Sequence, residues 1–136
     1  TEVGAKTKQF QFGEHMAVIS PTIVTNNPPG DGSIITYSWT MVTANDTGAP
    51  IPFAQWADRS VQFAGTWGGG TVVWEGSNDG TNYITLTDPQ ANAISKSADA
   101  IEQVMEVTLW ARPKVTVSVT SVVITLLARR PNPQRT

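Results

Sequence analysis

The alternation of apolar and polar residues predicts short β-strands along most of the chain. The clearest run covers residues 33–43, where Ile35, Tyr37, Trp39 and Met41 alternate with Thr and Ser. No segment predicts a helix of three or more turns, and turn-forming residues separate the apolar runs. The pattern predicts a sandwich or barrel of about seven or eight strands. The further strands are expected at residues 60–67, 71–77, 81–87, 104–113, 114–120 and 122–130.

Three short sequences predict how consecutive strands are joined. Asn78-Asp79-Gly80 predicts a hairpin between the strands that flank it. Thr120-Ser121 predicts a second, tight hairpin between the last two strands. Gly68–Gly70 predicts a turn or a bulge, because glycine adopts positive φ angles at little cost.

The last third of the chain carries two further expectations. Pro113 ends one strand, and Val115, Val117 and Val119 share one face of the next strand. Residues 88–103 are ambiguous, since they begin with a turn and continue with a sequence that suits either a helical turn or a strand.

The chain is expected to form a single domain with an extension at each end. Residues 1–33 predict an N-terminal arm with short strands, because apolar pieces there are interrupted by Pro and Gly. Residues 34–130 predict the β-sandwich itself. Residues 131–136 predict a flexible polar tail.

Composition narrows the classes of partner. Only 15% of the 136 residues are charged and the net charge is −2, so no basic face is expected and nucleic acid is excluded as a partner. Cysteine is absent, which excludes disulfides and thiolate metal sites. No apolar run reaches the roughly 20 residues that span a bilayer, so no membrane partner is expected. Thr1 fits removal of an initiator Met, and we expect cytoplasmic synthesis without a secretion signal.

Catalytic chemistry is not predicted. His15 is the single histidine and lies in the arm, away from a cluster of Ser and Asp at strand ends. The acidic residues do not form an evident pair in an apolar setting of the kind that glycoside hydrolysis requires. We therefore expect no enzymatic activity, no cofactor and no metal. The carboxylates considered are Glu75, Asp79, Glu102 and Glu106.

The oxygen-bearing side chains Asn78, Asp79 and Asn82 allow two interpretations. Calcium sites use such ligands, but the spacing differs from that of an EF-hand loop. Asx-Gly sequences form turns far more often than they bind ions, so we expect a turn.

The five tryptophans are candidates for core, interface or ligand contacts. Trp39 shares a face with Tyr37 and is expected in the core. Trp67 stands beside Gly68–Gly70 at a strand end, where it could contact a partner protein, pack locally or bind a ligand. In a carbohydrate-binding module, Trp67 and Tyr83 would be the aromatic pair that stacks on sugar.

Four motifs resemble the decoration or cement proteins of tailed-bacteriophage capsids. The first is a G-x-W-G-G-x-T turn at Gly65–Thr71, and the second is a Gly-Ser-Asn-Asp-Gly turn followed by an aromatic residue at Gly76–Tyr83. The others are Ala111-Arg112-Pro113 and the I-T-x-x-L-type strand at Ile124–Leu127. These motifs cover roughly half the chain, and none of their residues is catalytic in that family.

The resemblance implies a jelly-roll-like β-sandwich on the outer surface of an icosahedral head. It implies a structural virion protein that clamps neighbouring subunits of the major capsid protein and stabilises the head. It also implies self-association as a homodimer, with a trimer as the alternative. A carbohydrate-binding sandwich and a tail or fibre component are the competing functions.

Protein contact is expected from aromatic side chains outside the main strands and from the C-terminal arginines. Their assignment assumes that they are exposed. They are Phe10, Phe12, Phe53, Trp56, Trp67, Arg129 and Arg130.

Overall fold

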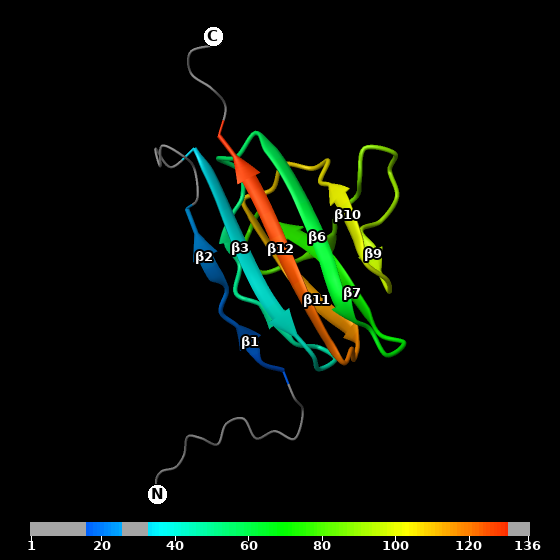
Figure 1. The fold of residues 1–136 in the computed structure, drawn as a ribbon. Helices are drawn as coiled ribbons and strands as arrows, with labels where there is room; N and C mark the ends of the chain where they lie inside the picture. Colours follow the sequence, from blue (N-terminus) through cyan, green and yellow to red (C-terminus); the bar gives the residue numbers. More distant parts are fainter. Residues whose placement is uncertain (1–15, 26–32, 131–136) are drawn as a thin grey trace, which may run out of the picture.

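A computed structural model describes residues 16–25 and 33–130, which form a β-sandwich of two sheets (Figure 1). The described residues contain no helix, and hence none that could cross a membrane. The predicted all-β sandwich is confirmed. One sheet has five strands in the order β10 (Ala100–Gln103), β6 (Asp58–Thr66), β12 (Ser121–Arg129), β3 (Ile34–Met41) and β2 (Thr22–Val24).

The other sheet has seven strands and is centred on β11 (Trp110–Val117). This strand pairs with β7 (Thr71–Ser77) on one side and with two short strands on the other. The described part holds more strands than expected because segments of two or three residues show no periodicity. The short strands are β1 (Val18–Ile19), β4 (Thr47–Gly48), β5 (Ile51–Pro52), β8 (Ile84–Thr85) and β9 (Ser95–Lys96).

Aromatic rings fill the space between the sheets. Trp39 from β3 and Trp74 from β7 are fully buried, and their ring centroids lie 5.7 Å apart in an edge-to-face arrangement. Tyr37 and Met41 are buried on the same face of β3 as Trp39, which confirms the predicted alternation. Each ring removes a large apolar area from water, so these contacts hold the two sheets together.

The predicted hairpin at Thr120-Ser121 is wrong. Strand β11 belongs to the seven-stranded sheet, whereas β12 lies between β3 and β6 in the other sheet. The chain therefore crosses the core between them. Both strands have one strongly apolar face, and crossing places those faces against each other instead of side by side. Ile124 and Leu126 of β12 are fully buried as a result.

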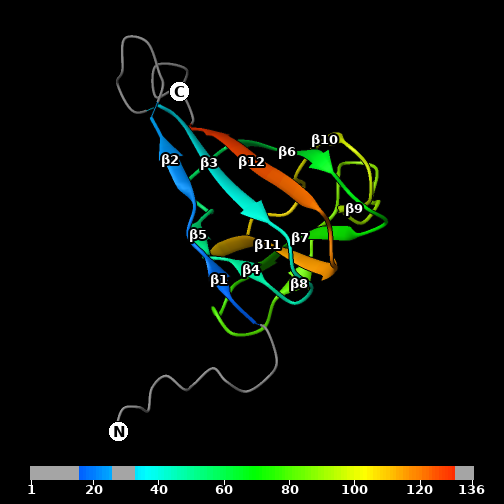
Figure 2. The same cartoon turned by 60° about the horizontal axis from the view of Figure 1, so that its bottom comes forward.

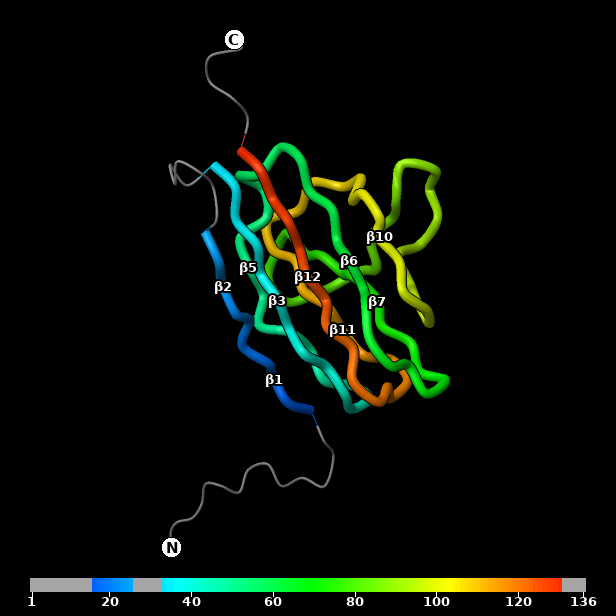
Figure 3. Tube along the Cα trace, viewed as in Figure 1, coloured from blue at the N-terminus to red at the C-terminus, as the bar shows by residue number. Residues whose placement is uncertain are grey.

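Two other connections cross between the sheets at the same end, namely residues 42–46 and 67–70 (Figure 3). The connection between β11 and β12 contacts both of the others, since Gly68 lies next to Thr120 and Gly70 next to Ser118. The Val119 amide donates to the Val42 carbonyl at 2.9 Å, and the Ala44 amide donates to the Ser118 hydroxyl at 2.8 Å. Gly68 and Gly69 have φ angles of 57° and 83°, so the predicted glycine turn is confirmed.

Strand β11 differs from prediction at two positions. It continues through Pro113. On that edge of β11, the pairing with β5 ends at Ala111 and β4 pairs only with Lys114, so neither short strand pairs with Pro113. A proline without an N–H is tolerated where the ladder is interrupted. A register shift between Val115 and Val117 turns Val117 outward, where it is 52% exposed, so the three valines do not share one face.

The described part of the N-terminal third extends both sheets (Figure 2). Strand β1 pairs in parallel with β4 at the edge of the seven-stranded sheet, and β2 pairs with β3 at the edge of the other. Phe10, Phe12, His15 and residues 131–136 lie outside the described residues.

Candidate functional site

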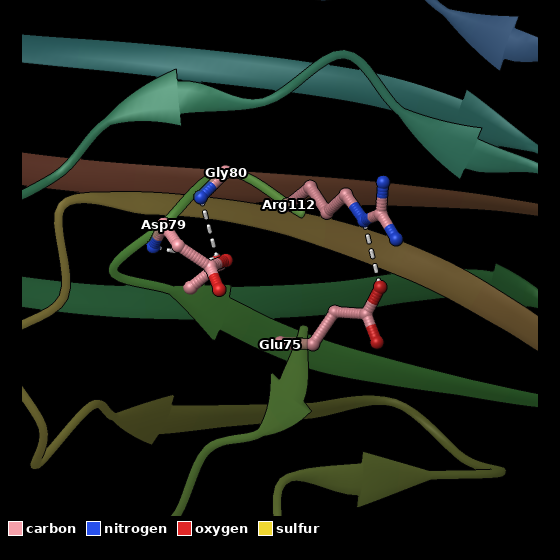
Figure 4. A network of polar contacts seen from close by, with 5 residues as sticks. Glu75, Asp79, Gly80 and Arg112 are labelled. Carbon is pink, nitrogen blue, oxygen red and sulfur yellow. Dashed lines mark hydrogen bonds and ion pairs between the residues drawn. The ribbon is translucent and has the colours of Figure 1, made fainter. Parts of the chain in front are cut away.

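The Asn78-Asp79-Gly80 turn is held together by the Asp79 carboxylate (Figure 4). One carboxylate oxygen accepts hydrogen bonds from the amides of Thr81 and Asn82 and from the Ser77 hydroxyl, each at 2.8 Å. The other oxygen accepts from the Asn82 side-chain amide at 2.8 Å. The bonds from Asn82 and Thr81, followed by that from Ser77, hold the pKa of Asp79 well below its ordinary value.

These contacts support the turn interpretation over the calcium interpretation. Both oxygens of Asp79 are used within the loop, and Gly80 has the positive φ of 77° that closes it. Among residues 16–25 and 33–130, no three His, Cys, Asp or Glu side chains gather as metal ligands do.

A second polar pair lies beside this turn, on the outer face of the seven-stranded sheet. Arg112 on β11 is directly opposite Glu75 on β7, and its Nε donates to a Glu75 carboxylate oxygen at 2.7 Å (Figure 4). The Arg112 guanidinium also lies over the Tyr83 ring, 3.6 Å from its centroid. Arg112 is therefore fixed by an ion pair on one side and a cation–π contact on the other.

The remaining candidate carboxylates are engaged elsewhere. Glu102 forms an ion pair with Lys96, and Glu106 accepts hydrogen bonds from the amide and hydroxyl of Thr87. Burial would raise the pKa of Glu106, but the bonds from Thr87 outweigh burial and lower it. The structure thus gives each candidate carboxylate its own local partner.

Trp67 packs locally. Its half-buried ring contacts Phe63 with centroids 6.5 Å apart, and its Nε1 donates to the Asp99 carboxylate at 2.9 Å. The Trp67 ring packs on Phe63 before the start of β7, whereas the Tyr83 ring packs on Arg112, opposite Glu75 near the other end of β7. The aromatic pair expected of a carbohydrate site does not form.

The expected exposure of Phe53 and Trp56 is wrong. Phe53 is fully buried with its ring 6.0 Å from that of Trp74, and Trp56 is 3% exposed with its Nε1 donating to the Pro52 carbonyl. Burial of a large aromatic ring removes a large apolar area from water, so a loop that places such rings in the core is strongly stabilised. Composition and turn signals do not reveal that placement.

The described C-terminal arginines lie at one end of the sandwich. Arg129 is exposed and pairs with Asp58 at 2.6 Å, across the β12–β6 ladder. Arg130 lies with its guanidinium 5.6 Å from the Trp56 ring centroid. These two residues remain candidates for contact with a partner.

The sequence analysis did not identify Arg59, a cation on the face of β6 that points into the core. It is 5% exposed, and its Nε and Nη1 have no hydrogen-bond partner among the described residues. The guanidinium lies over the Phe53 ring at 4.4 Å, and burial lowers the pKa of Arg59 against the opposing effect of Asp58. The sequence did contain a signal for its burial, because Arg59 lies at the same alternate positions as Val61 and Phe63, which are both buried.

Comparison with known proteins gives matches of fold only. No protein-family model matches the chain, and no curated protein matches it. Among solved structures, the SPBc2 prophage-derived protein YomS aligns over 70% of this chain and 93% of its own, with a TM-score of 0.55 and 10% identity. A Neisseria meningitidis protein aligns over 93% and 98% of the two chains, with a TM-score of 0.40 and 10% identity. KdgF from Halomonas sp. aligns over 84% and 81%, with a TM-score of 0.40 and 13% identity.

Proposed function

We propose that the chain is a non-enzymatic structural protein of a bacteriophage virion. In this proposal it binds the outside of the capsid and cements neighbouring subunits of the major capsid protein. Many copies that bind only the assembled shell would stabilise it by mass action. The partners are the major capsid protein and a second copy of the chain.

The observation that carries the proposal is that three of the four resemblance motifs meet in the fold, whereas the fourth, Ile124–Leu127, lies on β12 of the other sheet. Gly65–Thr71 leads into β7 and Gly76–Tyr83 leads out of it. Residues 111–113 pair with residues 74–76 across β11 and β7. Motif pieces that are far apart in the sequence therefore build one strand pair and its two turns.

Individual contacts join these pieces. Arg112 of the third motif contacts both Glu75 and Tyr83, which lie at β7 and in the second motif. These contacts support a shared scaffold over a chance match of short sequence segments. The prophage origin of YomS, which has a similar fold, is in keeping with a phage protein.

The test is co-sedimentation of the purified protein with heads of the encoding phage assembled without it, followed by heating of the particles. We expect saturable binding and a higher disruption temperature. Heads that already carry a full complement of the protein are the control and should take up no more. No binding at micromolar concentration would contradict cementing and would leave a tail or fibre role to be tested.

A further inference from the structure

The outer face of the five-stranded sheet is broad and uncovered. Figure 1 shows β3, β12 and β6 side by side at the front, with no other described segment over them. The ladder registers place one outward row across all five strands, and a parallel row two residues further along. We call this surface the open face. Its two central rows consist of Ile101, Gln62, Thr125, Ser38 and Thr22, and of Gln103, Ser60, Leu127, Thr36 and Val24.

The open face is almost without charge. Its two central rows contain no Asp, Glu, Lys or Arg, and a third outward row of Ala64, Val123 and Thr40 adds none. Charge enters at the ends. Asp58 and Arg129 lie opposite each other at one end and neutralise each other in an ion pair, and the Asp99 carboxylate accepts from the Gly65 amide at the other end. Solvated sheet faces are ordinarily rich in polar and charged residues, so this depletion is unusual.

The opposite outer face of the sandwich provides an internal contrast. There the seven-stranded sheet carries Glu75, Arg112 and Lys114 on adjacent positions of β7 and β11. The low overall charge of the chain therefore does not explain the open face. Charged residues lie in the middle of one outer face and only at the ends of the other.

The open face supplies more than half of the area that one partner of a standard protein complex buries, as the central part of an interface would. Strands spaced about 4.8 Å apart and rising about 3.3 Å per residue give an area on the order of 500 Å² for five strands of this length. Each partner of a standard protein complex buries roughly 800 Å².

The composition of the open face identifies the kind of partner. Hydroxyl and amide side chains outnumber the large aliphatic ones, of which Leu127 is 42% and Val123 is 37% exposed. Obligate homodimer interfaces resemble a hydrophobic core cut in half. Charge depletion with mixed polar and apolar groups is typical of the centre of contacts between separately folded proteins.

We propose that the open face is the surface by which the protein docks flat onto an uncharged surface of a separately folded protein. This inference rests on the proposed function, which names that partner as the outer surface of the major capsid protein. Because the central rows of the open face carry no charge, docking through them responds weakly to salt, unlike docking through Arg129 and Arg130.

The experiment places one charge at the centre of the open face. Thr125→Lys puts an ammonium between Ser38 and Gln62, where docking would bury it without a partner. Thr85→Lys is the matched control, since Thr85 lies outward opposite Glu75 on the other sheet. Thr125→Val keeps the open face uncharged. Binding of each variant to heads lacking the protein is measured at low and high salt, and a thermal melt of each free variant verifies that it is folded.

We expect Thr125→Lys to weaken head binding by about tenfold or more, and Thr85→Lys and Thr125→Val to change it by less than about threefold. We also expect wild-type binding to vary little with salt. If the wild type binds the heads and folded Thr125→Lys binds them equally well, the proposed docking surface is wrong. The proposed function would then still stand. Absence of wild-type binding would overturn the proposed function, and the docking partner with it.

A second copy of the chain is the alternative occupant, and sedimentation velocity of the free protein distinguishes it. We expect Thr125→Lys to leave the oligomeric state unchanged. A wild-type dimer that this substitution converts to monomers would assign the open face to self-association and overturn docking onto the capsid.

Discussion

Trp67 and Asp99 are 32 positions apart, yet the Trp67 indole N–H donates to the Asp99 carboxylate at 2.9 Å. The same carboxylate oxygen accepts from the Gly65 amide at 3.0 Å. Asp99 thus holds Gly65, the first residue of the Gly65–Thr71 motif, and the ring of Trp67 within that motif. The bond joins residues 65–67 to the segment just before β10, so the crossover between the sheets is fixed from outside the core.

Replacing Asp99 with Asn should loosen this crossover. The charged acceptor becomes a neutral amide that cannot accept two N–H groups equally well. We expect a lower melting temperature and faster hydrogen exchange at the Trp67 indole N–H by NMR. Asp58→Asn is the control, because it breaks an exposed ion pair with Arg129 that should contribute little. An unchanged indole exchange rate in Asp99→Asn would show that the bond does not hold the ring.

Stability should fall in acid because three aspartates have lowered pKa values. Hydrogen bonds received in the native state lower the pKa of Asp79, Asp88 and Asp99. A depressed folded pKa contributes stability above the unfolded value, near 3.9, and that contribution is lost as pH falls through the folded pKa. We expect urea midpoints to be flat from pH 7 to about 5 and to drop below about pH 4. Asp99→Asn should show a shallower drop than the wild type.

Gly70 and Gly69 should respond very differently to alanine. A Cβ at Gly70 would lie 2.1 Å from the Ser118 carbonyl oxygen and 2.5 Å from Val119 Cγ1, so backbone would have to move. At Gly69 nothing lies within 4 Å, and only the φ of 83° is unfavourable. We expect a loss of about 3 kcal/mol or more in unfolding free energy for Gly70→Ala, and about 1 kcal/mol for Gly69→Ala. Equal losses in urea unfolding would contradict the close packing of the crossovers.

Removing Arg112 should leave the Glu75 carboxylate, in a side chain only 6% exposed overall, without its ion-pair partner. We expect Arg112→Met to cost about 2 kcal/mol in unfolding free energy, because a largely buried charge loses its partner. The double variant Glu75→Gln with Arg112→Met should recover part of the loss, which a double-mutant cycle measures. Additive losses would show that the two side chains do not stabilise each other.

Arg59 should be dispensable for folding. Its guanidinium is buried with two N–H groups that lack partners among the described residues, and methionine fills a similar volume without that desolvation cost. We expect Arg59→Met to leave the urea midpoint unchanged or to raise it. A loss above about 2 kcal/mol would show that contact with Phe53, or attraction to Asp58 and Glu106, outweighs the burial cost.

Local patterns in the sequence determined the long strands β3, β6, β7 and β12, and the turns at Gly68–Gly70 and Asn78-Asp79-Gly80. Alternation identified the buried face of β3, since Tyr37, Trp39 and Met41 point to the same side of any strand. The bounds predicted for the strand at residues 71–77 coincide with those of β7. Asn78-Asp79-Gly80 formed the predicted turn because the side-chain hydrogen bonds that close it, to Asp79 and Ser77, are local.

The tertiary structure decided which strands became neighbours. Periodicity shows which face of β11 and β12 is apolar, but a hairpin within one sheet and a crossover between two sheets bury that face equally well. It also decided the positions of Phe53, Trp56 and Arg59, because loop rings and a strand arginine enter the core only when the opposite sheet provides the space. The uncharged central rows of the open face likewise arise only when residues from five separate strands are brought into register.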